Sequence, residues 1–197
     1  MFSFLNPHTI IAVLGLAGVI AVIFAETGLF IGFFLPGDTL LFTAGFLASE
    51  HQISLAWLLV GAFVAAVIGD SVGYAFGKKV GPAIFTRENS LFFDKKHIAR
   101  AQHFYEKHGK KTIILARFIP IIRTFAPIVA GIGNMSYKVF ISFNVIGAFA
   151  WTWAMLWIGY GFGSIIPNPD KYVLPAIILI IVISSAPALR EIFRKRV

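Results

Sequence analysis

Residues 112–133 read TIILARFIPIIRTFAPIVAGIG, an apolar run that two arginines and two prolines interrupt. Pro120 and Pro127 divide it into arms of about 8 to 12 residues, which as helices would be roughly 12 to 18 Å long. The hydrocarbon core of a bilayer is about 30 Å thick, so one arm crosses only about half of it. We therefore expect a re-entrant hairpin, whose backbone must be buried in protein or line a wet cavity.

A second apolar run, GLFIGFFLPGDTLLFTAGFLA at residues 28–48, is broken in the same way at Pro36-Gly37-Asp38. It predicts a second re-entrant hairpin. The break residues that we expect to be structural are Pro36, Gly37, Pro120 and Pro127. Four further apolar stretches have no such break and are long enough to span a bilayer; they are residues 8–25, 53–77, 137–163 and 172–190.

The composition agrees with a membrane protein. The chain has 197 residues, of which 58% are hydrophobic and 13% are charged, whereas a soluble domain carries about 25% charged residues. The predicted fold class is an all-α polytopic membrane protein with two opposed re-entrant hairpins and about four transmembrane helices. It is expected to form a single membrane domain over residues 1–197. We expect no nucleic-acid binding, because no soluble domain is predicted that could place a helix or strand in a nucleic-acid groove.

The stretch between the two halves is strongly basic. Residues 78–111 hold nine Lys and Arg against three acids, and residues 95–108 are expected to form an amphipathic helix at the membrane surface. Basic loops stay in the cytoplasm, so this loop and the basic C-terminal tail are expected there. With four spans, the N-terminus is then cytoplasmic as well, and the two hairpins open to opposite sides.

The chain also repeats itself at an offset of 84 to 86 residues. Phe34-Leu35-Pro36 matches Phe118-Ile119-Pro120 at 84. Three later matches share an offset of 86: Ala44-Gly45 with Ala130-Gly131, Gly61-Ala62-Phe63 with Gly147-Ala148-Phe149, and GYAFG at 73–77 with GYGFG at 159–163. Because the second and third spans cross in opposite senses, repeats over about 9–77 and 94–163 would be inverted, a pattern typical of secondary transporters.

The two copies carry opposite charges at their breaks. Glu26 and Asp38 belong to the first copy, and Arg117 and Arg123 to the second. A charged side chain near the bilayer centre costs about 3 to 15 kcal/mol, so we expect these acids and arginines to meet inside the protein. Asp70, within the predicted span 53–77, is a secondary candidate for the same reason. We expect Trp151, Trp153 and Trp157 to serve span packing or lipid contact.

The stretches FLPGDTLLFTAG, GDSVGYAFGKKVG and ARFIPIIRTFAPIVAGIGNM, together with Glu26, resemble the DedA family of bacterial inner-membrane proteins, which is related to lipid scramblases with the VTT domain. The resemblance covers about residues 20–165. It implies two opposed re-entrant hairpins, a place in the bacterial inner membrane and a role in moving lipids, with undecaprenyl phosphate as a substrate of some members and proton-dependent physiology. The family's functional residues correspond to Glu26, Asp38, Arg117 and Arg123.

We therefore expect a proton-coupled transporter, in which Arg117 and Arg123 bind a lipid phosphate while Glu26 and Asp38 carry protons. A phospholipid scramblase and a proton-coupled transporter of a small anion remain alternatives. An intramembrane lipid phosphatase is least supported, since no His pairs with an acid near the hairpins and no nucleophile adjoins a base. The chain is thus expected not to be an enzyme and to need no metal or cofactor, and a homo-oligomer is left open.

Overall fold

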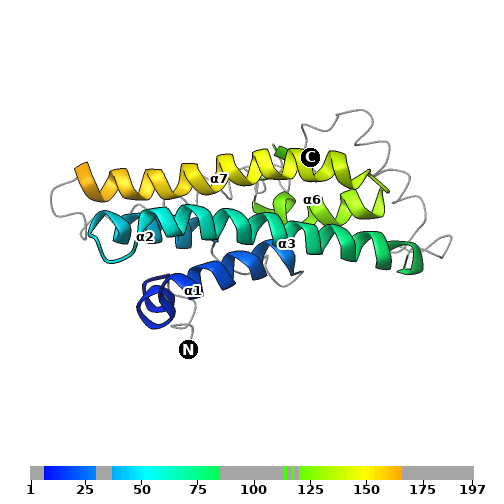
Figure 1. The fold of residues 1–197 in the computed structure, drawn as a ribbon. Coiled ribbons are helices and arrows are strands. Elements are labelled where there is room, and N and C mark those ends of the chain that lie inside the picture. Colours follow the sequence, from blue (N-terminus) through cyan, green and yellow to red (C-terminus); the bar gives the residue numbers. More distant parts are fainter. Residues whose placement is uncertain (1–6, 30–36, 85–112, 115–116, 118–119, 166–197) are drawn as a thin grey trace, which may run out of the picture.

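The computed structural model describes residues 7–29, 37–84, 113–114, 117 and 120–165. These residues contain five complete helices and no strand (Figure 1). The helices are α1 (Pro7–Gly28), α2 (Gly37–Ser49), α3 (Leu55–Ile84), α6 (Pro120–Ile132) and α7 (Tyr137–Ile165). The predicted helix 95–108, the predicted span 172–190 and the break residue Pro36 lie outside the described residues.

The two longest helices, α3 and α7, form the frame of the fold. Within the described part of the chain, Leu55–Val80 and Tyr137–Ile165 are the two helical stretches long and apolar enough to cross a membrane. They agree with the predicted spans 53–77 and 137–163, although α3 continues to Ile84. Both helices expose large apolar side chains, as lipid-facing helices do; examples are Trp57, Val60 and Ile68 of α3 and Ile146, Phe149 and Trp157 of α7.

The first predicted span, 8–25, is helical but not one straight helix. Inside α1, Gly15 adopts φ 56° and ψ −148°, which joins two helical segments at an angle. Glycine tolerates this positive φ because it has no Cβ. The segment after the bend, Gly15–Gly28, is too short to cross a membrane alone and packs against α3. The prediction of one unbroken membrane span at residues 8–25 was therefore wrong.

The two short helices, α2 and α6, each have 13 residues and begin at the predicted breaks. α2 starts at Gly37 and α6 starts at Pro120, so both correspond to the second arm of a predicted hairpin; the first arms lie largely outside the described residues. The expected second interruption at Pro127 is wrong, because α6 continues through this residue. The ring of Pro127 packs near Gly73 of α3, and such support from a neighbouring helix lets a membrane helix tolerate proline.

Each short helix is joined to a long one by a turn of the same kind. His51, with φ 59°, follows α2, and Asn134, with φ 55°, follows α6. In the first turn the amide of Gln52 donates to the carbonyl of Leu47, and in the second the amide of Met135 donates to that of Ala130. The order of short helix, left-handed turn and long helix therefore occurs twice in the described chain.

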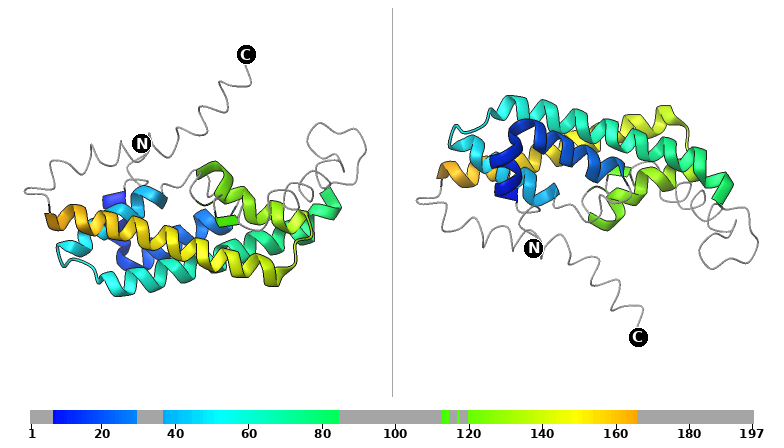
Figure 2. Two further views of the ribbon diagram at one scale, coloured as in Figure 1. Left: turned by 90° about the horizontal axis from the view of Figure 1, so that it is seen from above. Right: turned by 90° about the horizontal axis from the view of Figure 1, so that it is seen from below.

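Each short helix packs mainly against the long helix of the other half of the chain, an arrangement that we call exchanged pairs. α2 lies mainly against α7, and α6 lies mainly against α3 (Figures 1 and 2). Glycines let the backbones touch. A Cβ at Gly159 would overlap the carbonyl group of Phe42, and a Cβ at Gly77 would overlap that of Ile128. Small residues at contacts allow such close approach of membrane helices. Phe42 and Ile128 are themselves 86 residues apart.

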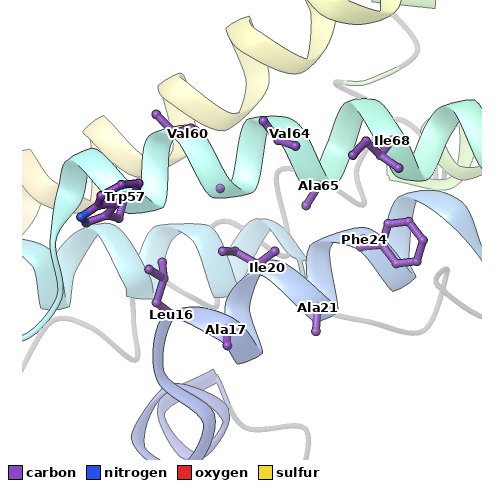
Figure 3. A pocket seen from close by; sticks show the side chains of 11 residues that line it. Leu16, Ala17, Ile20, Ala21, Phe24, Trp57, Val60, Val64, Ala65 and Ile68 are labelled. Carbon is purple, nitrogen blue, oxygen red and sulfur yellow. The ribbon is translucent and has the colours of Figure 1, made fainter.

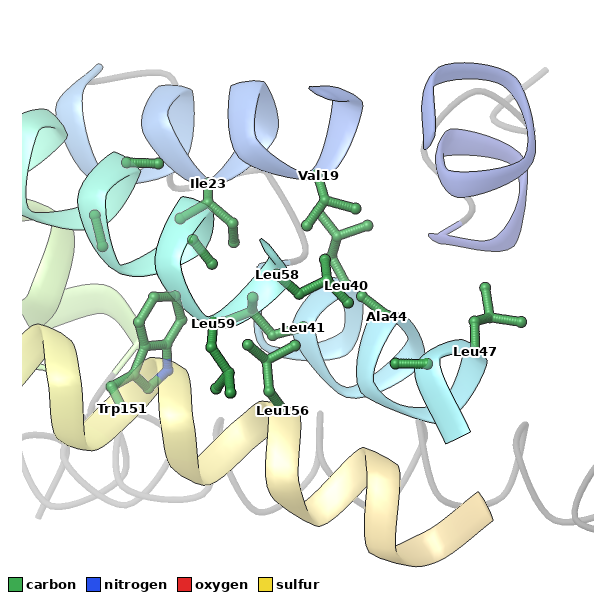
Figure 4. Packing of buried hydrophobic residues seen from close by; sticks show 14 of the residues in the cluster. Val19, Ile23, Leu40, Leu41, Ala44, Leu47, Leu58, Leu59, Trp151 and Leu156 are labelled. Carbon is green, nitrogen blue, oxygen red and sulfur yellow. The ribbon is translucent and has the colours of Figure 1, made fainter. Parts of the chain in front are cut away.

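The main apolar core fills the space between α1, α2, α3 and α7 (Figure 4). Its fully buried side chains include Val19, Ile23, Leu40, Leu58 and Leu156. A smaller cluster fixes α3 to the turn between α6 and α7: the Tyr74 hydroxyl donates to the carbonyl of Met135, and its ring stacks on Phe140 with centroids 4.7 Å apart. These contacts hold α2, α6 and the long helices around the polar groups described next.

Candidate functional site

Arg123, in the first turns of α6, is held by two carboxylates from the other half of the chain. Its Nη1 lies 2.5 Å from Oδ1 of Asp38 on α2, and its Nη2 donates to Oε1 of Glu26 on α1. Glu26 and Arg123 are buried, and the side chain of Asp38 is 14% exposed. We call Glu26, Asp38, Arg123 and Trp151 the Arg123 cluster.

Trp151 of α7 completes this cluster. Its indole Nε1 donates to Oδ1 of Asp38 over 2.8 Å, and its ring lies under the guanidinium of Arg123, with Cζ 4.7 Å from the ring centroid. A desolvated cation on the face of a tryptophan is stabilised by about 2 kcal/mol. Trp151 therefore fixes the acid and the base of one ion pair. Our expectation that it serves packing or lipid contact was incomplete.

Gly37 makes room for the acid of α1. A Cβ at this position would coincide with the carboxylate of Glu26, so no larger residue fits while Glu26 keeps its place. α2 begins at Gly37, so Asp38 lies inside the first turn of this helix. A negative charge in the first turn of a helix is favourable.

Arg117 is held by different partners. Its Nη2 donates to Oδ2 of Asp70 on α3 and lies 2.5 Å from Oδ1 of Asn144 on α7. The Asn144 amide in turn donates to the carbonyl of Val67 over 3.3 Å. Gly147, one turn along α7, leaves space for the arginine, since a Cβ there would lie 2.9 Å from Cδ of Arg117. We call Asp70, Arg117 and Asn144 the Arg117 cluster.

The two clusters are neighbours at different positions along α7. Asn144 and Trp151 are seven residues apart, which is about 10 Å along a helix. Arg123 acts electrostatically on both Asp70 and Arg117, so the clusters form one charged region. Both lie in the interior, where burying an unpaired charge is very unfavourable.

Within the described part of the chain, three side-chain atoms of this region are buried without a hydrogen-bond partner: Oε2 of Glu26, Nε of Arg117 and Nε of Arg123. The described ion pairs of the region join three carboxylates to two guanidinium groups, so with every one of these groups ionised they carry one net negative charge. One proton would make them neutral. Among the residues that the structure describes, no three His, Cys, Asp or Glu side chains are grouped as metal ligands; the acids face arginines instead.

Comparison with known proteins gives the family. The VTT domain matches residues 35–161. The chain is 46% identical to Protein DedA of Escherichia coli K12 over 177 residues, which cover 89% of this chain and 80% of that one. It is 40% identical to an uncharacterized membrane protein of Mycobacterium leprae over 185 residues, covering 94% and 82%. The chain belongs to the DedA family. No solved structure matches it.

Membership in the DedA family confirms the resemblance and makes the chain a membrane protein. The VTT match contains both clusters except Glu26, which lies ahead of residue 35. Glu26, Asp38 and Arg123, which the sequence placed at the breaks, are in contact. Arg117 is not in ion-pair contact with Glu26 or Asp38 in the described structure, but with Asp70.

Two residues of this candidate site were not predicted as polar partners from the sequence. Asn144 is a fully buried amide in the middle of an apolar helix, and Trp151 follows it by two turns on the same face. A buried amide in a membrane span is itself a sign of a polar partner. The periodic stripe Asn144, Ala148 and Trp151 marks the face of α7 that turns inward.

A groove outside the charged region is entirely apolar. It measures about 660 Å³ and lies between α1 and α3, where Leu16, Ile20, Phe24, Trp57 and Ile68 line it (Figure 3). None of its lining residues is ionisable. Its lining therefore suits hydrocarbon and not a charged group.

Proposed function

We propose that this protein is a transporter that carries a lipid phosphate across the membrane, with undecaprenyl phosphate as the favoured substrate and protons as the coupling ion. The observation that carries the proposal is Arg123. In the described structure, its two terminal nitrogens are held by two acids and its Nε is buried without a hydrogen-bond partner.

The chemistry of the guanidinium group supports a phosphate ligand. Arginine offers a planar fork of donors that matches two oxygens of a phosphate. In the structure the carboxylates of Glu26 and Asp38 take these donor positions. A phosphate must therefore displace at least one carboxylate from Arg123. The displaced carboxylate is then a buried charge without a partner, which is unfavourable unless it takes up a proton. Competition for Arg123 thus links binding of phosphate to binding of protons.

The charge of the region supports the same coupling. The three acids exceed the two arginines by one negative charge, and a phosphate monoester adds about 1.5 to 2 more near neutral pH. Several buried negative charges without compensation are very unfavourable. Entry of the headgroup is therefore expected together with protons, and an acidic outer compartment is expected to accelerate uptake toward a neutral interior.

We also propose that the chain is an inverted repeat with two opposed re-entrant hairpins in the bacterial inner membrane, its two termini in the cytoplasm. The repeated order of helix, turn and helix supports this arrangement, as do the exchanged pairs α2–α7 and α6–α3. The polyprenyl tail would remain in lipid along apolar faces such as the groove between α1 and α3.

The test is headgroup accessibility in proteoliposomes that contain undecaprenyl phosphate, with and without a pH gradient. Arg123→Ala is expected to abolish movement of the headgroup. Arg123→Lys is expected to restore less than about a tenth of it, because an ammonium group cannot replace the planar fork. Lys138→Ala removes an exposed basic residue at the start of α7 and is the matched control.

Full activity of Arg123→Lys would contradict recognition by the arginine fork. Equal movement of an ordinary phospholipid would favour a scramblase instead, and inhibition by soluble anions would favour transport of a small anion. Release of inorganic phosphate from the lipid would identify an enzyme. Membrane insertion of every variant is checked by its yield in the membrane fraction.

A further inference from the structure

The second segment of α1, Gly15–Gly28, lies between the apolar groove and the buried Arg123 cluster. Its side chains fall on two faces at helical spacing. One face lines the groove, with Ile20 and Phe24 among its residues (Figure 3). The other face is buried and carries Ile23 and Glu26. The segment is therefore a wall with an apolar surface on one side and an acid of the charged region on the other.

α3 forms the second wall of the groove and has the same two faces. Val64 and Ile68 line the groove and are exposed, whereas Ala66 and Asp70 are buried. The groove and the charged region thus lie on opposite sides of the contact between α1 and α3. A headgroup that reached Arg123 from the groove would have to pass between these two helices.

The contact between α1 and α3 is closed by small residues. At the crossing of the two backbones, a Cβ at Gly28 would lie 3.0 Å from Cα of Gly69. Farther along, the side chain of Ile20 covers Gly61. Within the described residues, no ion pair or side-chain hydrogen bond joins α1 to α3, and the Thr27 hydroxyl donates to its own helix. Separation of the two helices would therefore leave no polar partner behind.

The same segment has a hinge at one end and is tied to Arg123 near the other. Gly15 adopts φ 56° and ψ −148°, a conformation almost confined to glycine, and a Cβ there would meet nothing within 4 Å. Hinges are a few residues at the ends of elements that absorb changes in φ and ψ. The tie is the ion pair of Glu26 with Arg123. Neutralising Glu26 would weaken it.

We propose that Gly15–Gly28 is a lateral gate, through which the phosphate headgroup of the lipid passes from the groove to Arg123 while the hydrocarbon tail stays in the groove. The groove, at about 660 Å³, has the volume of a ligand site and holds a length of tail beside the gate. This inference rests on the proposed transport of a lipid phosphate. It adds the route of entry, and it makes neutralisation of Glu26 the step that opens this route.

A disulfide across the gate tests the route, because the chain contains no cysteine of its own. Ile20→Cys with Gly61→Cys suits this purpose, since Cγ1 of Ile20 lies 2.9 Å from the position of a Cβ at Gly61. A sulfur in place of that Cγ1 is close enough for a sulfur–sulfur bond of about 2.05 Å. The matched control is Gly73→Cys with Ile128→Cys, which joins α3 to α6 across a corresponding separation of 3.6 Å.

Movement of the undecaprenyl phosphate headgroup in proteoliposomes is measured for each protein when reduced, after oxidation and after renewed reduction. Oxidation of the Ile20→Cys, Gly61→Cys protein is expected to lower transport at least tenfold, and reduction is expected to restore it. Oxidation of the control protein is expected to change transport less than twofold. Because one protein is compared in two redox states, closure of the gate is separated from damage by the substitutions. Counting free thiols verifies that each disulfide forms.

A second measurement follows the gate without a disulfide. Spin labels at Ala21→Cys and Val72→Cys, both exposed positions, report the distance between α1 and α3. A second, longer distance is expected when undecaprenyl phosphate is added and in the Glu26→Gln background. Labels at Val72→Cys and Ile146→Cys join α3 to α7 and are expected to keep one distance throughout.

Equal transport by the oxidised and reduced forms of the Ile20→Cys, Gly61→Cys protein would overturn the inference, because the headgroup would then reach Arg123 by another route. A single unchanged distance between α1 and α3, with the lipid and with Glu26→Gln, would overturn it too. Absence of transport by the parent chain would instead refute the proposed function on which the inference rests.

Discussion

The Arg123 cluster and the Arg117 cluster each compensate the charge of a buried arginine, but with different partners. Arg123 is shared by two acids and stacked on an indole ring, so its neighbourhood has an excess of negative charge. Arg117 has one acid and one neutral amide, so its neighbourhood is balanced. The excess acid of the first cluster is a group that can change partner or take a proton without leaving the arginine alone. The second cluster has no such reserve.

The largest difference between the clusters is expected when one acid is neutralised. Asp70→Asn leaves Arg117 buried with amides only, and loss of one partner of a buried ion pair costs about 3 to 5 kcal/mol. Glu26→Gln leaves Arg123 paired with Asp38 and keeps an oxygen near Nη2, so a loss of about 1 kcal/mol is expected. Thermal unfolding in detergent at neutral pH measures both.

Glu50→Gln, in the exposed turn after α2, is the control for these changes and is expected to leave the unfolding temperature unaltered. Equal destabilisation by Asp70→Asn and Glu26→Gln would mean that the second acid on Arg123 gives no reserve, and the contrast between the clusters would not hold.

A smaller effect is expected from Trp151→Phe, which acts on the Arg123 cluster alone. The change removes the indole donor to Asp38 but keeps an aromatic face beneath Arg123. A hydrogen bond to a charged group contributes about 1.5 to 3 kcal/mol, so a loss within that range is expected in thermal unfolding. Trp153→Phe is the control on the outer face of the same helix; if it destabilises the protein as much, the indole bond is not the cause.

The smallest effect on stability is expected when one of two glycines at equivalent positions of the two halves, Gly147 or Gly61, is replaced by alanine. Gly147→Ala places a methyl group against the ion-paired Arg117, whereas Gly61→Ala places one against Cδ1 and Cγ1 of Ile20, a side chain that borders the apolar groove and can turn into it. Alanine favours a helix by about 1 kcal/mol over glycine, which offsets part of any crowding. We expect Gly147→Ala to destabilise by about 1 kcal/mol and Gly61→Ala to be neutral or stabilising. Identical unfolding temperatures would show that Arg117 adjusts without cost.

The sequence predicted those parts of the fold that depend on composition along one segment. The long apolar stretches gave α3 and α7, and the Pro-Gly break and Pro120 gave the starts of α2 and α6. The bend at Gly15 was not predictable, because Gly18 lies in the same apolar run and nothing local distinguishes the two. The continuation of α6 through Pro127 depends on its packing against α3, which a local reading does not contain.

The charged residues of the site were found because a charge in an apolar run needs a partner. The partner of each charged residue could not be predicted, since it depends on the position of α3 and α7 along their axes relative to the short helices. Asp70, which pairs with Arg117, lies where α3 crosses the end of α1 and Gly69 closely approaches Gly28. Trp151 was missed because an indole in a membrane helix ordinarily needs no polar partner.

The backbone contacts at Gly159 and Gly77 have a mechanical consequence. They join α2 to α7 and α6 to α3 so closely that each pair is expected to move as one rigid body, built from one helix of each half. The bridge from Asp38 to Arg123 then crosses the seam between the two bodies and acts as a latch. Rocking of one body against the other is then expected to break this ion pair, so release of Asp38 would favour the motion.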